Sequence, residues 1–120
     1  MDPARFEQLV GESLAALPEK FFQALENVAI HVADLPGPGQ MDEMDEGDPY
    51  HLLGLYEGIP LTQRDFGYAG VLPDRITIFR LPILQICRTD EEIREQVLKT
   101  VMHELGHYFG MDEDQLSQFE

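Results

Sequence analysis

The stretch Thr100-Val-Met-His-Glu-Leu-Gly-His-Tyr-Phe-Gly110 contains the pattern H-E-x-x-H, formed by His103, Glu104 and His107. Residues four apart on an α-helix lie on one face, with about 5–6 Å between their Cβ atoms. Two imidazoles at that spacing can bind one zinc ion, each at about 2.0–2.1 Å from the metal. Glu104 is rotated by about a quarter turn from His103, so it is better placed to reach a metal-bound water than to bind the metal.

The residues before and after this motif predict a long helix over 90–109. Thr89 and Glu92 form the capping-box pattern T-x-x-E at its start. Gly110 suits the position just after the last helical turn. We therefore expect the motif to lie near the end of a helix that crosses the domain.

The polar and apolar positions of this helix predict its surroundings. A polar stripe steps along it by 4, 3 and 4 residues, at Gln96, Thr100, His103 and His107. Apolar residues flank the stripe on both sides, namely Ile93, Val97 and Val101 on one side and Leu98, Met102, Leu105 and Phe109 on the other. A helix of this kind is buried, and its narrow polar stripe faces a cavity. Two histidines can also be satisfied core polar groups, but the acidic cluster after Gly110 favours a metal site.

The longer pattern from His103 to Glu113, HELGHYFGMDE, resembles the HExxHxxGxxH motif of the zincins, in their metzincin-like branch, with an acid as the last residue. Residues 72–116, together with GLYEGIPL at 54–61, resemble the small zincin-like metallopeptidase family of short bacterial proteins. This resemblance implies a zincin-like fold, a bound Zn²⁺ ion and peptidase activity. It also implies that an edge strand beside the metal binds an extended peptide.

Three acids compete to be the third protein ligand of the metal. The resemblance places an acid or a histidine at Glu113, and we expect this residue to complete the set with His103 and His107. Asp112 suits the N-cap of a last short helix, whereas Asp114 would point about 100° away from Glu113 on that helix. Both remain alternatives.

The length, cysteine content, net charge and hydropathy of the chain further restrict its possible fold and function. Its 120 residues fit one domain, 1–120, and its single cysteine, Cys87, excludes an internal disulfide. The net charge of −15 argues against nucleic-acid partners, which need clustered Lys and Arg. No apolar run could span a membrane and no signal peptide is visible, so we expect a cytoplasmic protein without a membrane partner.

Periodicity predicts an α+β domain in which a small twisted mixed sheet of three or four strands packs against the long helix. We expect further helices over 3–16, 18–26 and 82–87, and strands over 28–32, 52–58 and 75–80. The Pro-, Gly- and acid-rich residues 34–50 predict no core element. Arg75–Arg80 is the best strand near the long helix in sequence, and we expect it to be the edge strand beside the metal.

The predicted activity is that of a minimal zinc metalloendopeptidase, which acts as a monomer on a peptide or protein substrate with Glu104 as the general base. Tyr68, Tyr108 and His31 are candidates for a second donor to the oxyanion, although a structural role is favoured for each. Two alternatives stay open: a metal-dependent hydrolase of a non-peptide substrate, and a metal-binding regulatory or interaction module without peptidase activity.

Overall fold

The computed structural model describes residues 1–37, 39–40, 48–58 and 74–110. Helices and strands follow one another in an α+β order, as predicted. They are α1 (Pro3–Leu14), α2 (Glu19–Ala24), β1 (Val28–Ala33), the 3₁₀ helix η2 (Pro49–His51), β2 (Gly54–Glu57), β3 (Asp74–Phe79), α3 (Arg80–Ile86) and α4 (Asp90–Tyr108).

The three strands form a mixed sheet in the order β1-β3-β2. β1 runs parallel to β3, and β2 runs antiparallel to it, with Tyr56 opposite Ile76. Our prediction that Arg75–Arg80 is an edge strand was therefore wrong, because β3 is central. That prediction rested on the closeness of this strand to the long helix in sequence, which does not determine strand pairing: β1 and β2 pair with β3 on either side. The strand beside α4 at the sheet edge is β2.

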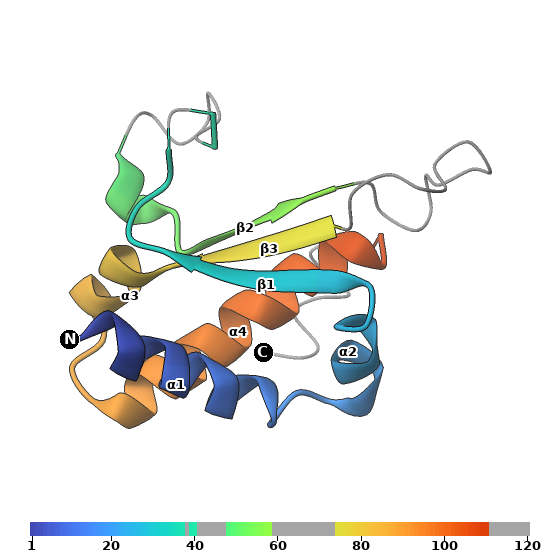
Figure 1. Cartoon of the computed structure of the whole chain (residues 1–120), viewed down its shortest axis with the longest axis horizontal. Coiled ribbons are helices and arrows are strands. Elements are labelled where there is room, and N and C mark those ends of the chain that lie inside the picture. Colours follow the sequence, from blue (N-terminus) through green and yellow to red (C-terminus); the bar gives the residue numbers. More distant parts are fainter. Residues whose placement is uncertain (38, 41–47, 59–73, 111–120) are drawn as a thin grey trace.

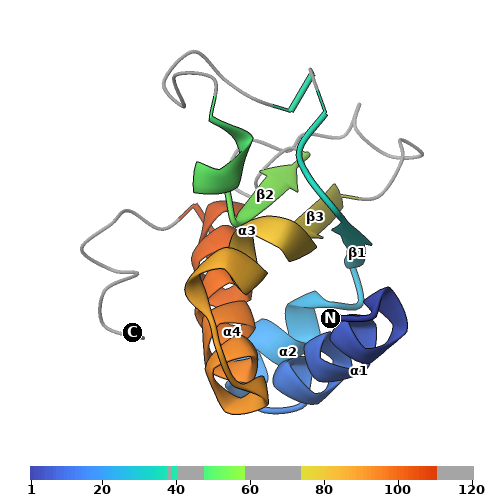
Figure 2. The same ribbon diagram turned by 90° about the vertical axis from the view of Figure 1, so that its left-hand side faces the viewer.

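The helices α1, α2 and α4 cover one face of this sheet, and α3 lies next to the start of α4 (Figures 1 and 2). Between them is one continuous core, to which every layer contributes fully buried side chains. These include Phe6, Leu9, Phe21, Ile76, Ile78, Ile83, Val97, Val101 and Leu105. None of the described helices combines the length and apolarity needed to cross a bilayer.

The start and end of α4 agree with the predicted span of 90–109. The Thr89 hydroxyl accepts a hydrogen bond from Glu92 N at 3.1 Å, which is half of the predicted capping box. The Glu92 carboxylate completes the cap differently, since it accepts from Arg88 N at 3.0 Å rather than from Thr89 N. Gly110 has φ 70°, the left-handed conformation expected after a helix end.

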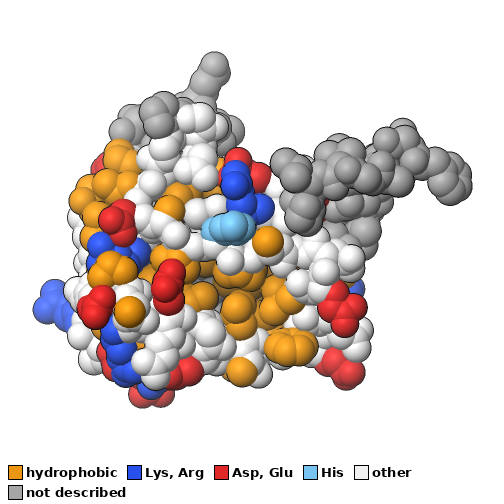
Figure 3. Space-filling model, viewed as in Figure 1, with side chains coloured by type: hydrophobic (Ala, Val, Ile, Leu, Met, Phe, Trp, Pro, Cys, Tyr) orange, Lys and Arg blue, Asp and Glu red, His pale blue; other side chains and the backbone are white. Residues whose placement is uncertain are grey.

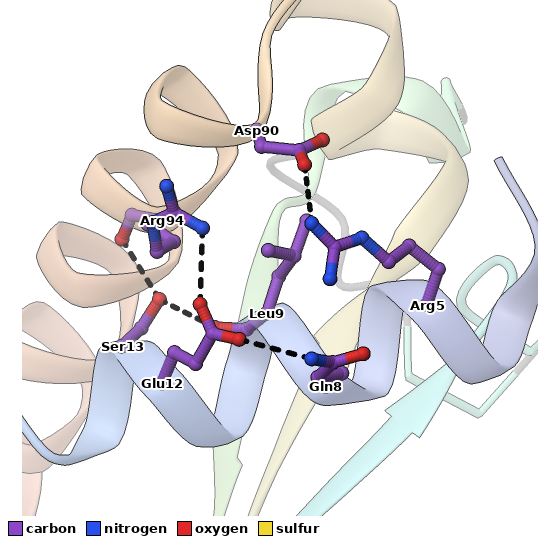
Figure 4. Close-up of polar contacts among 7 residues, drawn as sticks. All are labelled: Arg5, Gln8, Leu9, Glu12, Ser13, Asp90 and Arg94. Atoms are coloured by element: carbon purple, nitrogen blue, oxygen red, sulfur yellow. Dashed lines mark hydrogen bonds and ion pairs between the residues drawn. The ribbon is translucent and has the colours of Figure 1, made fainter.

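The helix α1 is held against α4 by polar contacts at the rim of the core (Figure 4). Arg94 Nη1 donates to Glu12 at 3.0 Å, and Arg5 pairs with Asp90 at the first turn of α4. The buried Ser13 hydroxyl is within hydrogen-bond distance of Arg94 O, at 3.0 Å. These contacts set how α1 lies along the long helix.

The remaining predicted boundaries shift by a few residues. The helix α3 begins at Arg80, so Pro82 lies in its first turn, where its missing N–H needs no partner. The 3₁₀ helix η2 begins inside 34–50, where no core element was expected, and none of its residues is buried. The predicted helix after Asp112 lies outside the described residues.

Candidate metal centre

The last two turns of α4 bring the three motif residues together, as their spacing predicts. The imidazole rings of His103 and His107 lie 5.5 Å apart between centroids, at an angle of 68°. One potential ligand atom from each of His103, Glu104 and His107 lies within 4.8 Å of the other two. This separation is small enough for side-chain rotation to bring both imidazoles onto one ion.

The donor chemistry fits zinc. Imidazole nitrogens and carboxylate oxygens are ligands that Zn²⁺ takes in proteins, at about 2.0–2.2 Å. Two histidines one helical turn apart supply two of the three protein ligands that a catalytic zinc site uses. Further ligands are expected from the chain after Gly110, and Glu113, Asp114 and Asp112 all lie outside the described residues.

The edge strand β2 holds Glu104 in place. Tyr56 N donates a hydrogen bond of 2.8 Å to Glu104 Oε1, and His107 Nδ1 lies 3.6 Å from the same oxygen. The Glu104 side chain is only 11% exposed, whereas that of His107 is 44% exposed. The carboxylate is therefore at the junction of α4 and β2, oriented by the backbone of the neighbouring strand.

A cleft of about 380 Å³ opens between the start of β2 and α4, and His103 and Glu104 lie at one end of it. Gln96, Thr100 and His103 of the predicted polar stripe lie in its helix wall, where Gln96 Nε2 donates to Thr100 Oγ1 at 3.2 Å. Leu52 and Leu53 supply apolar surface opposite. The close approach of the two walls needs Gly54, because a Cβ there would lie 2.6 Å from Thr100 Cγ2.

The three candidates for a second oxyanion donor differ in position. His31 lies on β1, at the sheet edge opposite β2, and lines a separate groove of about 390 Å³ against α1. Apolar side chains gather along that groove in Figure 3. His31 is therefore far from the centre in the fold. Tyr68 and the side chain of Tyr108 lie outside what the structure describes.

Sequence reasoning missed two residues beside the centre. Tyr56 contacts Glu104 through its backbone and the His107 ring through its side chain, and its hydroxyl donates to the carboxylate of Asp74. The segment GLYEGIPL contains Tyr56, but no pattern within it indicates which side chain faces the helix. Asp74 is 1% exposed, and its place before an alternating strand gave no signal of burial.

A helix-borne H-E-x-x-H motif beside an edge strand and a cleft is the arrangement of a candidate zincin-type metal centre. The chain belongs to the zincin-like metallopeptidase family, whose sequence pattern matches residues 25–120. Membership implies a metal, typically zinc, and the His-Glu-His group described above could bind one.

The fold has a solved counterpart. A conserved hypothetical protein from Thermo thermophilus is similar at a TM-score of 0.57 and 23% identity, over 99% of this chain and 100% of that chain. At that identity the likeness shows the shared fold alone. A comparison with curated proteins found no significant match.

Proposed function

We propose that this chain is a zinc-dependent peptidase in which His103 and His107 hold the metal and Glu104 is the general base. The observation that carries this proposal is the meeting of these three side chains beside an edge strand, with His103 and Glu104 at the end of a cleft. A catalytic zinc site needs an open position for water or substrate, and the cleft provides access to it.

Glu104 and its hydrogen-bond partner Tyr56 have separate roles in the proposed peptide hydrolysis. A bound zinc ion would supply a Lewis acid and lower the pKa of a bound water towards about 7. Glu104 accepts the proton of the attacking water and later passes it to the leaving amine. The hydrogen bond from Tyr56 N supports this role, because it orients the carboxylate.

The edge strand β2 supports a peptide or protein as substrate. In the antiparallel pair, Phe79 N donates to Leu53 O, so alternation turns the backbone groups of Gly54 and Tyr56 away from β3. Tyr56 N already donates to Glu104 Oε1, so an extended peptide that adds to this edge would use its other outward-facing backbone groups, while the adjoining cleft takes a side chain. The substrate strand therefore belongs on β2 instead of the central β3.

The third ligand remains a proposal. Glu113 follows Gly110 by three residues, and a carboxylate completes the set of two histidines and one acid that some catalytic zinc sites use. Asp114 and Asp112 are the alternatives, and alanine variants of the three acids, compared for zinc affinity, would identify the ligand.

The test compares Glu104→Gln with wild type. Glutamine keeps an acceptor for Tyr56 N but cannot take up a proton, so we expect retained zinc and a loss of peptide hydrolysis of about 10²–10⁴-fold. Glu95→Gln, an exposed change on the same helix, is the matched control and should keep full activity. His103→Ala and His107→Ala should each lose stoichiometric zinc in elemental analysis.

Each contrary result has a distinct meaning. Full activity in Glu104→Gln would show that the general-base assignment is wrong. Full zinc content in either histidine variant would remove the site from α4. If zinc-loaded wild type cleaves no member of a peptide library, the result supports the alternative hypothesis of a metal-binding regulatory module.

A further inference from the structure

Tyr56 makes three contacts around the proposed centre, each with a different part of the residue. Its backbone N–H donates to Glu104 Oε1 at 2.8 Å. Its ring meets the His107 ring edge to face, with centroids 6.3 Å apart and an interplanar angle of 90°. Its hydroxyl donates to Asp74 Oδ2. One residue of the edge strand thus contacts both the general base and a metal-binding histidine.

The pleat of the sheet explains this placement. Tyr56 is opposite Ile76, which is fully buried, so both side chains lie on the sheet face that packs against α4. Asp74 is two residues before Ile76 and shares that face, as the diagonal neighbour of Tyr56. The register of β2 against β3 therefore directs the Tyr56 hydroxyl towards Asp74 and the Tyr56 ring towards His107, near the C-terminal end of α4.

Asp74 is a firm anchor for the phenol. The residue is 1% exposed, and a buried carboxylate is stable only when it is hydrogen-bonded. Gly58, the residue after β2, lies so close to Asp74 that a Cβ added there would be 2.3 Å from Asp74 Oδ1. An aspartate so tightly enclosed has little freedom to move, and it transfers that rigidity to the Tyr56 ring.

We infer that Tyr56 is a positioning residue for the metal centre: anchored by Asp74, its ring holds the His107 imidazole in the orientation that binds metal. This inference rests on the proposed function. The His107 side chain is 44% exposed, so without a neighbour its imidazole could occupy several rotamers. Groups that orient a metal-binding histidine raise affinity because they limit its alternatives before the metal binds.

The experiment measures zinc affinity by competition with a chelator, in variants that remove the contacts in steps. Tyr56→Phe keeps the ring and removes the hydroxyl bond to Asp74, whereas Tyr56→Leu removes both and keeps the backbone N–H. We expect zinc affinity to fall in the order wild type, Phe, Leu, and the leucine variant to lose about 10–100-fold. Tyr50→Phe, on the exposed 3₁₀ helix, is the matched control and should bind zinc as wild type does.

If Tyr56 only stabilised the fold, another variant that weakens the core should lose zinc affinity as Tyr56→Leu does. Val10→Ala is the comparison here, because it weakens the core on α1, away from the centre. If Tyr56→Leu binds zinc within twofold of wild type, the inference is overturned, even if that variant unfolds more easily. Should the leucine variant fail to fold, wild-type affinity in Tyr56→Phe would overturn the anchoring by Asp74.

The same measurement separates this inference from the proposed function. Wild type that binds no zinc overturns both. Wild type that binds stoichiometric zinc, together with unchanged affinity in both Tyr56 variants, overturns the positioning role alone. A graded loss without any change in Val10→Ala supports the positioning role.

Discussion

Gly58 has a conformation that few other residues could take. Its φ is 153°, and a Cβ would meet the Asp74 side chain at 2.3 Å. We expect Gly58→Ala to lower the free energy of unfolding by about 1–3 kcal/mol, from backbone strain and from displacement of Asp74. Gly11→Ala is the control, because Gly11 lies within α1 and a Cβ added there would meet nothing within 4 Å beyond the backbone of its own helix. That change should stabilise by about 0.5–1 kcal/mol, and urea unfolding of both variants measures the contrast.

Cys87 has a thiol whose pKa is shifted by its surroundings. Burial, and after it the negative charge of Glu92, raises the pKa of this thiol above its usual value of 9.0. A raised pKa leaves less thiolate at any given pH, so alkylation by iodoacetamide should be slower than for an unfolded control, with its midpoint at higher pH. Glu92→Gln should move that midpoint down, because it removes the second cause. A midpoint at or below that of the unfolded chain would contradict this account.

Some residues of the candidate centre are positioned by local contacts within one helix, and others by contacts between segments far apart in the sequence. His103, Glu104 and His107 could be predicted because helical spacing alone fixes their mutual positions. Tyr56 and Asp74 lie 18 residues apart, and they meet only through the pairing of β2 with β3. Their roles depend on strand register, which no local pattern in the sequence indicates.

Among the elements, α4 depends most on its first turn. Thr89 Oγ1 accepts from Glu92 N, which satisfies one of the N–H groups that a helix start leaves unpaired. Thr89→Ala should therefore lower the free energy of unfolding by about 1 kcal/mol. Thr89→Ser keeps the hydroxyl and should stay close to wild type in the same urea titration. Equal losses in both variants would mean that the methyl group matters rather than the cap.

The strands were less predictable than this helix. The alternation in β3 correctly predicts a strand, yet its central place follows from having β1 and β2 on either side. Those strands come from distant parts of the chain, and the parallel pairing of β1 with β3 has no local turn to indicate it. The long helix was predictable because its cap, period and C-terminal glycine are all local signals.

In the molecule as a whole, α4 connects the candidate metal centre to the core. Its C-terminal end carries His103 and His107, while Val97, Val101 and Leu105 on the same helix are fully buried. The helix α1 packs along it with the fully buried Leu9 in the common core and the polar contacts of Figure 4 at the rim. A change in the mobility of α4 should therefore affect the stability of both the sheet and α1.

This connection predicts that zinc stabilises the whole domain. A ligand that binds only the native state adds about 2.7 kcal/mol to the free energy of unfolding when its concentration is 100 times its dissociation constant. We expect a stabilisation of that size in urea titrations with and without zinc, because His103 and His107 are brought together only when α4 is formed. His107→Ala should lose most of it, whereas His51→Ala, a change at a side chain that is 74% exposed, should keep it. The same stabilisation in His107→Ala would mean that zinc acts elsewhere on this acidic chain, and a bound ion without any stabilisation of wild type would mean that it binds the unfolded chain equally well.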